Sequence, residues 1–276
     1  MLLPHKNIAI AGDRMLVFGG VYGNLQAFEA LMAEARRLGL SSAQMICTGD
    51  LVAYCGDPSE VVDAFRQSGI ETIQGNCEDS LAQGSDDCGC GFDDGTACSL
   101  LSAQWYAFCR AELRQDQTEW MASLPRSITV TLGSHTFRVV HGTTSSINEF
   151  VFPSVDEAHL AGQFTSEDFD HVLAGHSGIP FHRRVGARSW INSGALGMPA
   201  NDGTPRVWYA LITVKETGTV DVTFHGLDYD YQGAAATMKA KGLVNGYADC
   251  LKSGLWPSLD VLPQAEQALT GQPLTF

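Results

Sequence analysis

The chain has 276 residues, of which 45% are hydrophobic and 17% charged, and its formal net charge is -14. This composition excludes intrinsic disorder, because it supplies enough apolar side chains for a sizeable core. The acidic balance argues against a nucleic-acid backbone as the main partner, since phosphate contacts need clustered lysine and arginine. Residues 1–14 resemble neither a signal peptide nor a membrane span, so we expect a cytoplasmic protein.

The first part of the chain alternates short apolar runs with amphipathic segments. Residues 15–18 predict the first strand, and Asn24 is placed to cap a helix that Gly39 ends. Residues 45–48 predict the second strand, after which Asp57-Pro58-Ser59-Glu60 predicts a helix start with a capping box. This alternation predicts a parallel sheet covered by helices.

Residues 80–95 interrupt the pattern with an acidic, glycine-rich loop that is long enough to be functional. Its acidic side chains are Asp86, Asp87, Asp93 and Asp94. Helical segments, a hairpin and further strands that continue a second sheet follow at 100–113, 118–124, 127–132 with 135–140, 181–185, 206–213 and 220–224. No linker divides the chain, so we expect one domain over 1–276, with a helical C-terminal segment from about residue 231.

Four of the predicted strands run into a glycine that is paired with a polar residue. These strand ends deliver Asp50, Asn76, His141 and His176. Open α/β sheets bind their ligands at the carboxyl ends of the strands. One carboxylate, one amide oxygen and two imidazoles suit Mn, Fe or Zn better than Ca or Mg. The pattern therefore predicts a site for one divalent transition metal.

Each of these residues also has a purely structural interpretation. Asp50 and Asn76 are residue types that hold turns through their side chains. A single histidine on an apolar strand is more often a hydrogen-bonded core residue than a ligand. His141 and His176 both follow strands at glycine-containing ends, and this repetition favours the ligand interpretation.

The order of these motifs resembles that of the calcineurin-like metallophosphoesterases, in particular their small bacterial branch. The resemblance covers nearly the whole chain. It includes Gly49-Asp50-Leu51-Val52 and also Asn192-Ser193-Gly194, which is similar to the Asn-Pro-Gly-Ser loop of the family. It implies a two-sheet αββα sandwich of the α/β class and two adjacent metals that clamp a phosphate. It also implies that Asp50 is shared by both metals and that Asn192, Ser193 and Gly194 contact the substrate.

The same resemblance implies that one of the two metal positions is lost. Three of its ligands are replaced by Gly20, Tyr22 and Gly178, and Tyr22 is expected to fill the site. Cys77 stands where the family has a catalytic histidine. A thiol with a pKa near ~8.5 is a poor proton donor, and acid–base help is typically worth about 10²–10⁴ in rate. We therefore expect a degenerate centre with Asp50 and Cys77 at the catalytic positions.

The chain has eight cysteines, which we expect to be thiols or metal ligands rather than disulfides, because no export signal is visible. Cys77, Cys88, Cys90 and Cys98 lie in one segment, but their spacing matches no zinc ribbon. Two interpretations stay open: a solvated loop with free thiols, or a second, thiolate-bound metal that folds the loop over the cleft.

Two functions are consistent with these observations. The first is a metal-dependent phosphoesterase that acts on a small phosphorylated or nucleotide substrate through an altered centre. The second is a non-catalytic relative that binds a metal or a phosphorylated ligand in a regulatory role. Either way, the expected partner is a small phosphorylated molecule and not a membrane.

Overall fold

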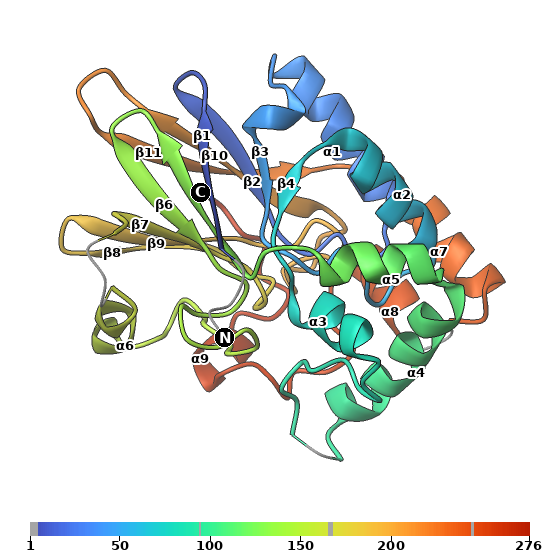
Figure 1. Cartoon of the computed structure of the whole chain (residues 1–276). Helices are drawn as coiled ribbons and strands as arrows, with labels where there is room; N and C mark the ends of the chain where they lie inside the picture. The colour runs from blue at the N-terminus through green and yellow to red at the C-terminus, as the bar shows by residue number, and fades with distance from the viewer. Residues whose placement is uncertain (1–4, 94, 165–167, 244–245) are drawn as a thin grey trace.

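Two β-sheets stacked face to face form the centre of the molecule, and helices cover their outer faces (Figure 1). The computed structural model describes residues 5–93, 95–164, 168–243 and 246–276, so Asp94 of the acidic loop lies outside the described residues. The first sheet has five strands in the order β11-β10-β2-β3-β4, and the second has six in the order β1-β5-β6-β7-β9-β8. The predicted two-sheet α/β sandwich is confirmed.

The five-stranded sheet consists of β2 (Arg14–Phe18), β3 (Met45–Cys47), β4 (Glu71–Thr72), β10 (Val207–Val214) and β11 (Val220–Leu227). The helices on its outer side and around its end are α1 (Leu25–Arg37), α2 (Pro58–Ser68), α3 (Asn76–Gln83), α4 (Ala97–Glu112), α5 (Gln115–Ala122), α7 (Tyr231–Ala240) and α8 (Tyr247–Ser253). β2, β3 and β4 are parallel, whereas β10 is antiparallel to both β2 and β11.

Both faces of this sheet are buried, which explains the continuous apolar runs in the sequence. In β2, Met15 and Val17 point into the layer between the two sheets, while Leu16 and Phe18 point under the helices. The helices follow their sequence signals at their ends. Asn24 caps α1 by accepting a hydrogen bond from the backbone nitrogen of Ala27 at 3.1 Å.

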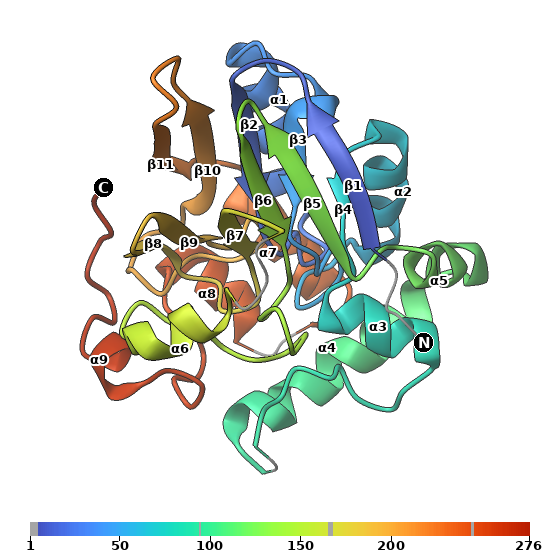
Figure 2. The ribbon, with the colours of Figure 1, turned by 60° about the vertical axis from the view of Figure 1, so that its left-hand side comes forward.

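The six-stranded sheet consists of β1 (His5–Ile10), β5 (Ser127–Leu132), β6 (His135–Val139), β7 (His171–Ala174), β8 (Pro180–Val185) and β9 (Arg188–Ser193). The predicted hairpin is present, since β5 pairs antiparallel with β6 and Leu132 faces His135. The short helix α6 (Glu157–Gly162) packs against the outer face of this sheet through Leu160 (Figure 2).

The strand order differs from the sequence prediction in three places. β1 precedes the strand predicted to be first and pairs in parallel with β5. β9 was not predicted, and its last residues include Asn192 and Ser193. β10 and β11 belong to the five-stranded sheet and do not continue the second one. Apolar patterning identifies a strand but not its partner, because either sheet can bury the same alternating side chains.

Three predicted local features also need correction. Asp57 precedes α2, but its side chain does not cap the helix. Its carboxylate instead accepts hydrogen bonds from Nε2 of Gln26 at 3.3 Å and from Nζ of Lys241 at 3.4 Å. The interruption begins later than predicted, because α3 extends to Gln83. The C-terminal segment is only partly helical, since α8 is followed mainly by irregular chain and the short helix α9 (Gln264–Gln267).

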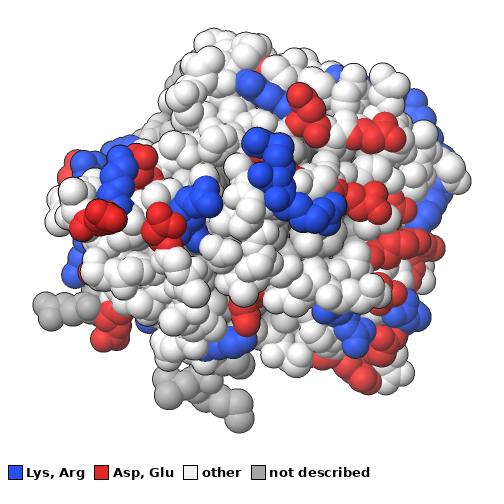
Figure 3. All heavy atoms as spheres, turned by 90° about the horizontal axis from the view of Figure 1, so that it is seen from above, with Lys and Arg blue, Asp and Glu red and all other residues white. Residues whose placement is uncertain are grey.

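On the face shown in Figure 3, basic side chains lie in small groups among acidic ones. Among the described residues, no helix is both long and apolar enough to cross a bilayer.

Candidate metal centre

The four predicted ligands come together at the carboxyl ends of two pairs of parallel strands. Asp50 follows β3, and Asn76 begins α3 just after β4. His141 follows β6 and His176 follows β7. Potential ligand atoms of Asp50, His141 and His176 all lie within 4.8 Å of one another, and within the described ranges they form the one such group.

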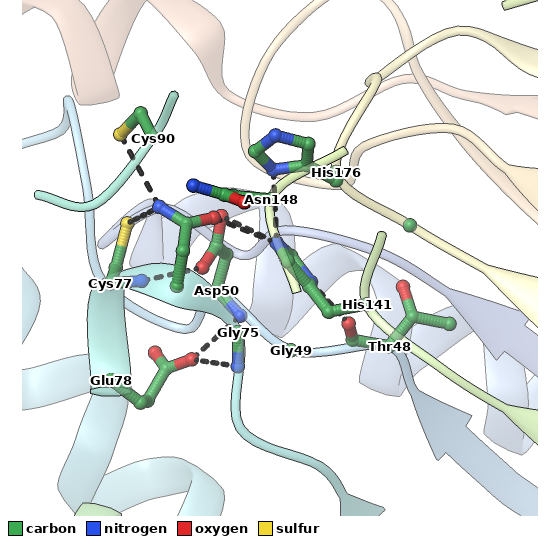
Figure 4. Close-up of polar contacts among 12 residues, drawn as sticks. Thr48, Gly49, Asp50, Gly75, Cys77, Glu78, Cys90, His141, Asn148 and His176 are labelled. Atoms are coloured by element: carbon green, nitrogen blue, oxygen red, sulfur yellow. Dashed lines mark hydrogen bonds and ion pairs between the residues drawn. The ribbon is translucent and has the colours of Figure 1, made fainter. Parts of the chain in front are cut away.

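Nε2 of His141 lies at the centre of this group, where Asp50, His141 and His176 point toward one another (Figure 4). It is 3.1 Å from Oδ2 of Asp50, 3.0 Å from Oδ1 of Asn76 and 3.3 Å from Nδ1 of His176. Asp50, Asn76 and His141 are each at least 95% buried. Water therefore has little access to Asp50, Asn76 and His141, whereas His176 is only partly buried.

Hydrogen bonds to the backbone orient His141 and Asn76 so that two acceptor atoms, Nε2 of His141 and Oδ1 of Asn76, face each other. Nδ1 of His141 lies 2.6 Å from the carbonyl oxygen of Thr48 and must donate to it, so the neutral ring presents a lone pair at Nε2. Nδ2 of Asn76 donates to the carbonyl oxygen of Cys88 at 2.9 Å, which turns Oδ1 toward His141. A positive charge between two such acceptor atoms would relieve their repulsion. A metal-bound histidine commonly donates its other ring N–H to a backbone carbonyl, as His141 does here.

A proton is the alternative source of that charge. Burial acts to lower the pKa of His141, but Asp50 outweighs it, and the pKa of His141 ends above its usual value. Burial and then His141 lower the pKa of His176 to about 3, so this ring is neutral at pH 7. Its Nε2 is buried without a hydrogen-bond partner among the described residues. The donor set thus fits a divalent transition metal, which would compete with a proton at His141.

Two of the four residues adopt a left-handed backbone conformation that is uncommon outside glycine. The φ angles are 58° for Asp50 and 62° for His176. Gly75 supports the first turn, because a Cβ there would collide with the Asp50 carboxylate. Gly175 supports the second, because a Cβ there would collide with the side chain of Thr48. These clashes give a physical reason for the glycines that mark the strand ends in the sequence.

Residues 14–217 match the calcineurin-like phosphoesterase superfamily domain. The chain belongs to this superfamily. An uncharacterized protein from Methanocaldococcus jannaschii is 23% identical over 218 residues, which is 72% of this chain and 82% of that protein.

Two solved structures share the fold. A metallophosphoesterase from Sphaerobacter thermophilus has a TM-score of 0.68 at 24% identity, and the match covers 88% of this chain and 100% of that one. A hypothetical protein from Pyrococcus horikoshii OT3 has a TM-score of 0.73 at 17% identity, with 90% and 99% covered. At these identities the likeness concerns the fold alone.

In this member of the superfamily, a buried carboxylate that was not predicted from the sequence holds the site together. Glu78 is fully buried and accepts hydrogen bonds from the backbone nitrogens of Asp50, Leu51 and Gly75, each at 2.8 Å. Burial and then Asp50 raise the pKa of Glu78 to about 7, against the effect of its backbone donors. Its position three residues after Gly75, at the start of α3, was the available sequence signal.

The ring of Tyr22 lies directly against Gly20, and the loss of one metal position at these residues stays a prediction. A Cβ on Gly20 would collide with the ring of Tyr22, so that ring takes the space in which a ligand side chain would begin. Burial and then Asp50 raise the pKa of Tyr22 well above its usual value, which keeps the phenol neutral. Tyr22 is 6% exposed and belongs to the hydrophobic core.

Cys77, at the predicted catalytic position, is buried beside Asp50. Its backbone nitrogen donates to Oδ1 of Asp50 at 3.1 Å, and its sulfur is 3.5 Å from Nδ2 of Asn76. Burial and then Asp50 raise the pKa of the thiol. Cys77 therefore remains a neutral thiol, and its catalytic role stays a prediction.

The cysteines of the acidic loop are not arranged as predicted. Cys88 and Cys90 form a disulfide, so the expectation of thiols or thiolate ligands is wrong for this pair. Gly89, with a φ of 63°, permits the tight turn between them. The loop nevertheless returns to the metal centre, where the sulfur of Cys90 is 3.3 Å from Nδ2 of Asn76. Cys98 instead interacts with Ser258.

The disulfide makes a simple count testable. Unfolded in denaturant without reductant, the protein should show six reactive thiols, because the other six cysteines are free. After reduction the number should rise to eight. Colorimetric thiol titration measures both values. Eight thiols before reduction would contradict the pairing of Cys88 with Cys90.

The predicted substrate loop is buried and supports His176. Nδ2 of Asn192 donates to the carbonyl oxygen of Gly175 at 2.7 Å and to the hydroxyl of Ser177 at 2.8 Å. Its Oδ1 accepts from the backbone nitrogen of Gly194 at 2.9 Å. Asn192 thus fixes the residues on both sides of His176. Substrate contacts by Asn192, Ser193 and Gly194 stay a prediction.

Proposed function

We propose that this chain is a metal-dependent phosphoesterase that acts on small phosphorylated or nucleotide substrates through a single divalent transition metal. The observation that carries the proposal is the convergence of Asp50, Asn76, His141 and His176, acceptor against acceptor, in a member of the phosphoesterase superfamily. When bound, a divalent ion supplies positive charge that polarises a phosphate oxygen.

The protein contributes a fixed arrangement of donors to this chemistry. The Thr48 carbonyl sets the tautomer of His141, and the Cys88 carbonyl sets the orientation of the Asn76 amide. Two imidazoles with one carboxylate favour Mn, Fe or Zn over the alkaline-earth ions. Because the side chains are already aligned, a substrate phosphate meets a site that needs little rearrangement.

Turnover is expected to be slow. The proposed reaction lacks a second Lewis acid, and the position of the Tyr22 ring, in the space that a side chain on Gly20 would take, supports this. The neutral thiol of Cys77 is a weak proton donor. Loss of general acid catalysis typically lowers the rate by about 10²- to 10⁴-fold.

Metal stoichiometry and turnover test the proposal together. We expect anomalous density for one ion in the cleft, and slow hydrolysis of 4-nitrophenyl phosphate that a chelator abolishes and Mn²⁺ restores. Two fully occupied ions in the cleft would contradict the single-metal centre. Hydrolysis that persists unchanged after chelation would contradict metal dependence.

A second candidate function is non-catalytic binding of a metal or a phosphorylated ligand in a regulatory role. The buried Tyr22 ring and the neutral Cys77 thiol favour it, because both replace groups that would act on the transition state. Metal-dependent phosphate binding without detectable turnover would select this function over the first.

A further inference from the structure

An aromatic pocket opens beside the metal centre. Its rings are those of Tyr22, Tyr54, Phe92, Phe150, Tyr247 and Trp256. His176 also lines the pocket, so one imidazole borders both the metal centre and this cavity. Part of the pocket is open to solvent.

Two of these rings lie against the glycines that the resemblance places at metal-ligand positions. The Tyr22 ring takes the space of a side chain on Gly20. On the other side, a Cβ on Gly178 would lie 3.4 Å from Cζ2 of Trp256. The former metal position therefore borders on apolar rings instead of ligand atoms.

The walls of the aromatic pocket are flat and without formal charge. Phe150 stacks on His176 with ring centroids 4.0 Å apart, and Phe92 stacks on Phe150 at 6.0 Å. Tyr54 and Tyr247 pack against each other at 4.5 Å. Among the described residues that line this pocket, none is an aspartate, glutamate, lysine or arginine. Such walls match a planar, uncharged group, because aromatic rings stack on one another and a charge would lose its hydration.

We propose that the aromatic pocket binds a planar ring carried on a phosphate, while the phosphate itself lies at the metal centre. This inference rests on the proposed function, which places a phosphate there. His176 connects the two sites, because its Nδ1 faces His141 while its ring face stacks on Phe150. One ligand can therefore reach both the metal centre and the aromatic pocket. The substrate class is thus an aromatic phosphate ester, either a nucleotide or a simpler aryl phosphate.

Hydroxyl groups in the lining are compatible with a base as well as with a simple aryl ring. Ser177 and Ser258 both line the pocket. Tyr22 also lines the pocket and is 6% exposed. Its phenol O–H can donate a hydrogen bond to a ligand oxygen or nitrogen.

Three non-hydrolysable probes test the proposal on the unmodified, Mn²⁺-loaded protein. Phenylphosphonate, cyclohexylphosphonate and methylphosphonate share one anionic head but differ in the attached group. Stacking on aromatic side chains is worth roughly 10- to 100-fold in affinity. Calorimetric titration should therefore give a phenylphosphonate Kd at least about 10-fold below that of methylphosphonate, and below that of cyclohexylphosphonate.

The outcomes separate this inference from the function on which it rests. Equal affinities for all three probes, each lost on chelation, would overturn the aromatic pocket but leave metal-dependent phosphate binding intact. Equal affinities for the phenyl and cyclohexyl probes would overturn the planar-ring assignment. If no probe binds in the presence of Mn²⁺, the proposed function fails and this inference fails with it.

A matched pair of variants places the effect in the pocket. Trp256→Leu removes one wall and should lower the affinity for phenylphosphonate about 10-fold, with the affinity for methylphosphonate unchanged. Phe224→Leu is the control, because Phe224 lies on β11 and packs on Phe276 at 4.6 Å, outside the pocket. The ratio of the two affinities within one variant is insensitive to partial unfolding. An unchanged ratio in Trp256→Leu would contradict the proposal.

Discussion

Replacing His141 by alanine is expected to abolish tight metal binding. Nε2 of His141 is the atom nearest to the other three donor atoms, at 3.0 to 3.3 Å, so its loss opens the middle of the site. Removing even an outer partner of a metal ligand typically costs 10- to 100-fold in affinity, so we expect a loss of more than about 100-fold. Titration of the metal-free protein with Mn²⁺ or Zn²⁺ measures it.

His182→Ala is the matched control for this change. His182 lies on β8, where its Nε2 is 3.0 Å from the hydroxyl of Ser189, and it belongs to no ligand group. Its removal should leave the metal affinity unchanged. Stoichiometric, tight binding by the His141→Ala variant would show that the ion is held elsewhere.

Replacing Glu78 by alanine is expected to lower the free energy of unfolding by about 3 kcal/mol or more. Three backbone N–H groups, those of Asp50, Leu51 and Gly75, would lose their acceptor in a buried environment. Leaving a buried polar group without a partner costs about 1–3 kcal/mol. The midpoint of urea unfolding, measured without metal, should fall accordingly. The metal affinity should fall as well, because Asp50 would lose its support.

Glu266→Ala separates the two effects of this substitution. Glu266 is also a buried carboxylate, and it accepts from the backbone nitrogen and the hydroxyl of Ser154, both at 2.8 Å. Its loss should destabilise the fold while the metal affinity stays the same. An unfolding midpoint of Glu78→Ala that equals that of the unmodified protein would refute the role given to Glu78.

The sequence predicted the parts of the site that depend on local chain geometry. A short apolar run that ends at a glycine specifies both a buried strand and the turn behind it. Asp50 and His176 follow such runs, and positions 75 and 175 are restricted to glycine because a Cβ there would collide with Asp50 and with Thr48. The alternation of these runs with helices predicted a parallel sheet, whereas the two-sheet sandwich was implied by the resemblance to the superfamily.

The remaining features depend on contacts between distant segments. Glu78 is one of two acidic residues in the first turn of α3, and only the folded chain shows that it also binds the turn after β3. The pairing of Cys88 with Cys90 depends on the path of the loop around Asn76. The sheet to which β10 belongs is decided by its antiparallel contact with β2. None of these contacts has a periodic signal in the sequence.

The left-handed backbones of Asp50 and His176 imply a conflict between durability and binding. A residue with a Cβ loses roughly 1–2 kcal/mol in that conformation, whereas glycine does not. Substituting glycine at either position would remove the backbone strain but also delete a ligand side chain. Selection of variants for heat resistance alone should therefore favour substitutions that destroy the metal site. The packing around Gly75 and Gly175 determines both turns, so we expect the fold itself to hold these donors in place. Loading the centre should accordingly change the shape of the protein very little.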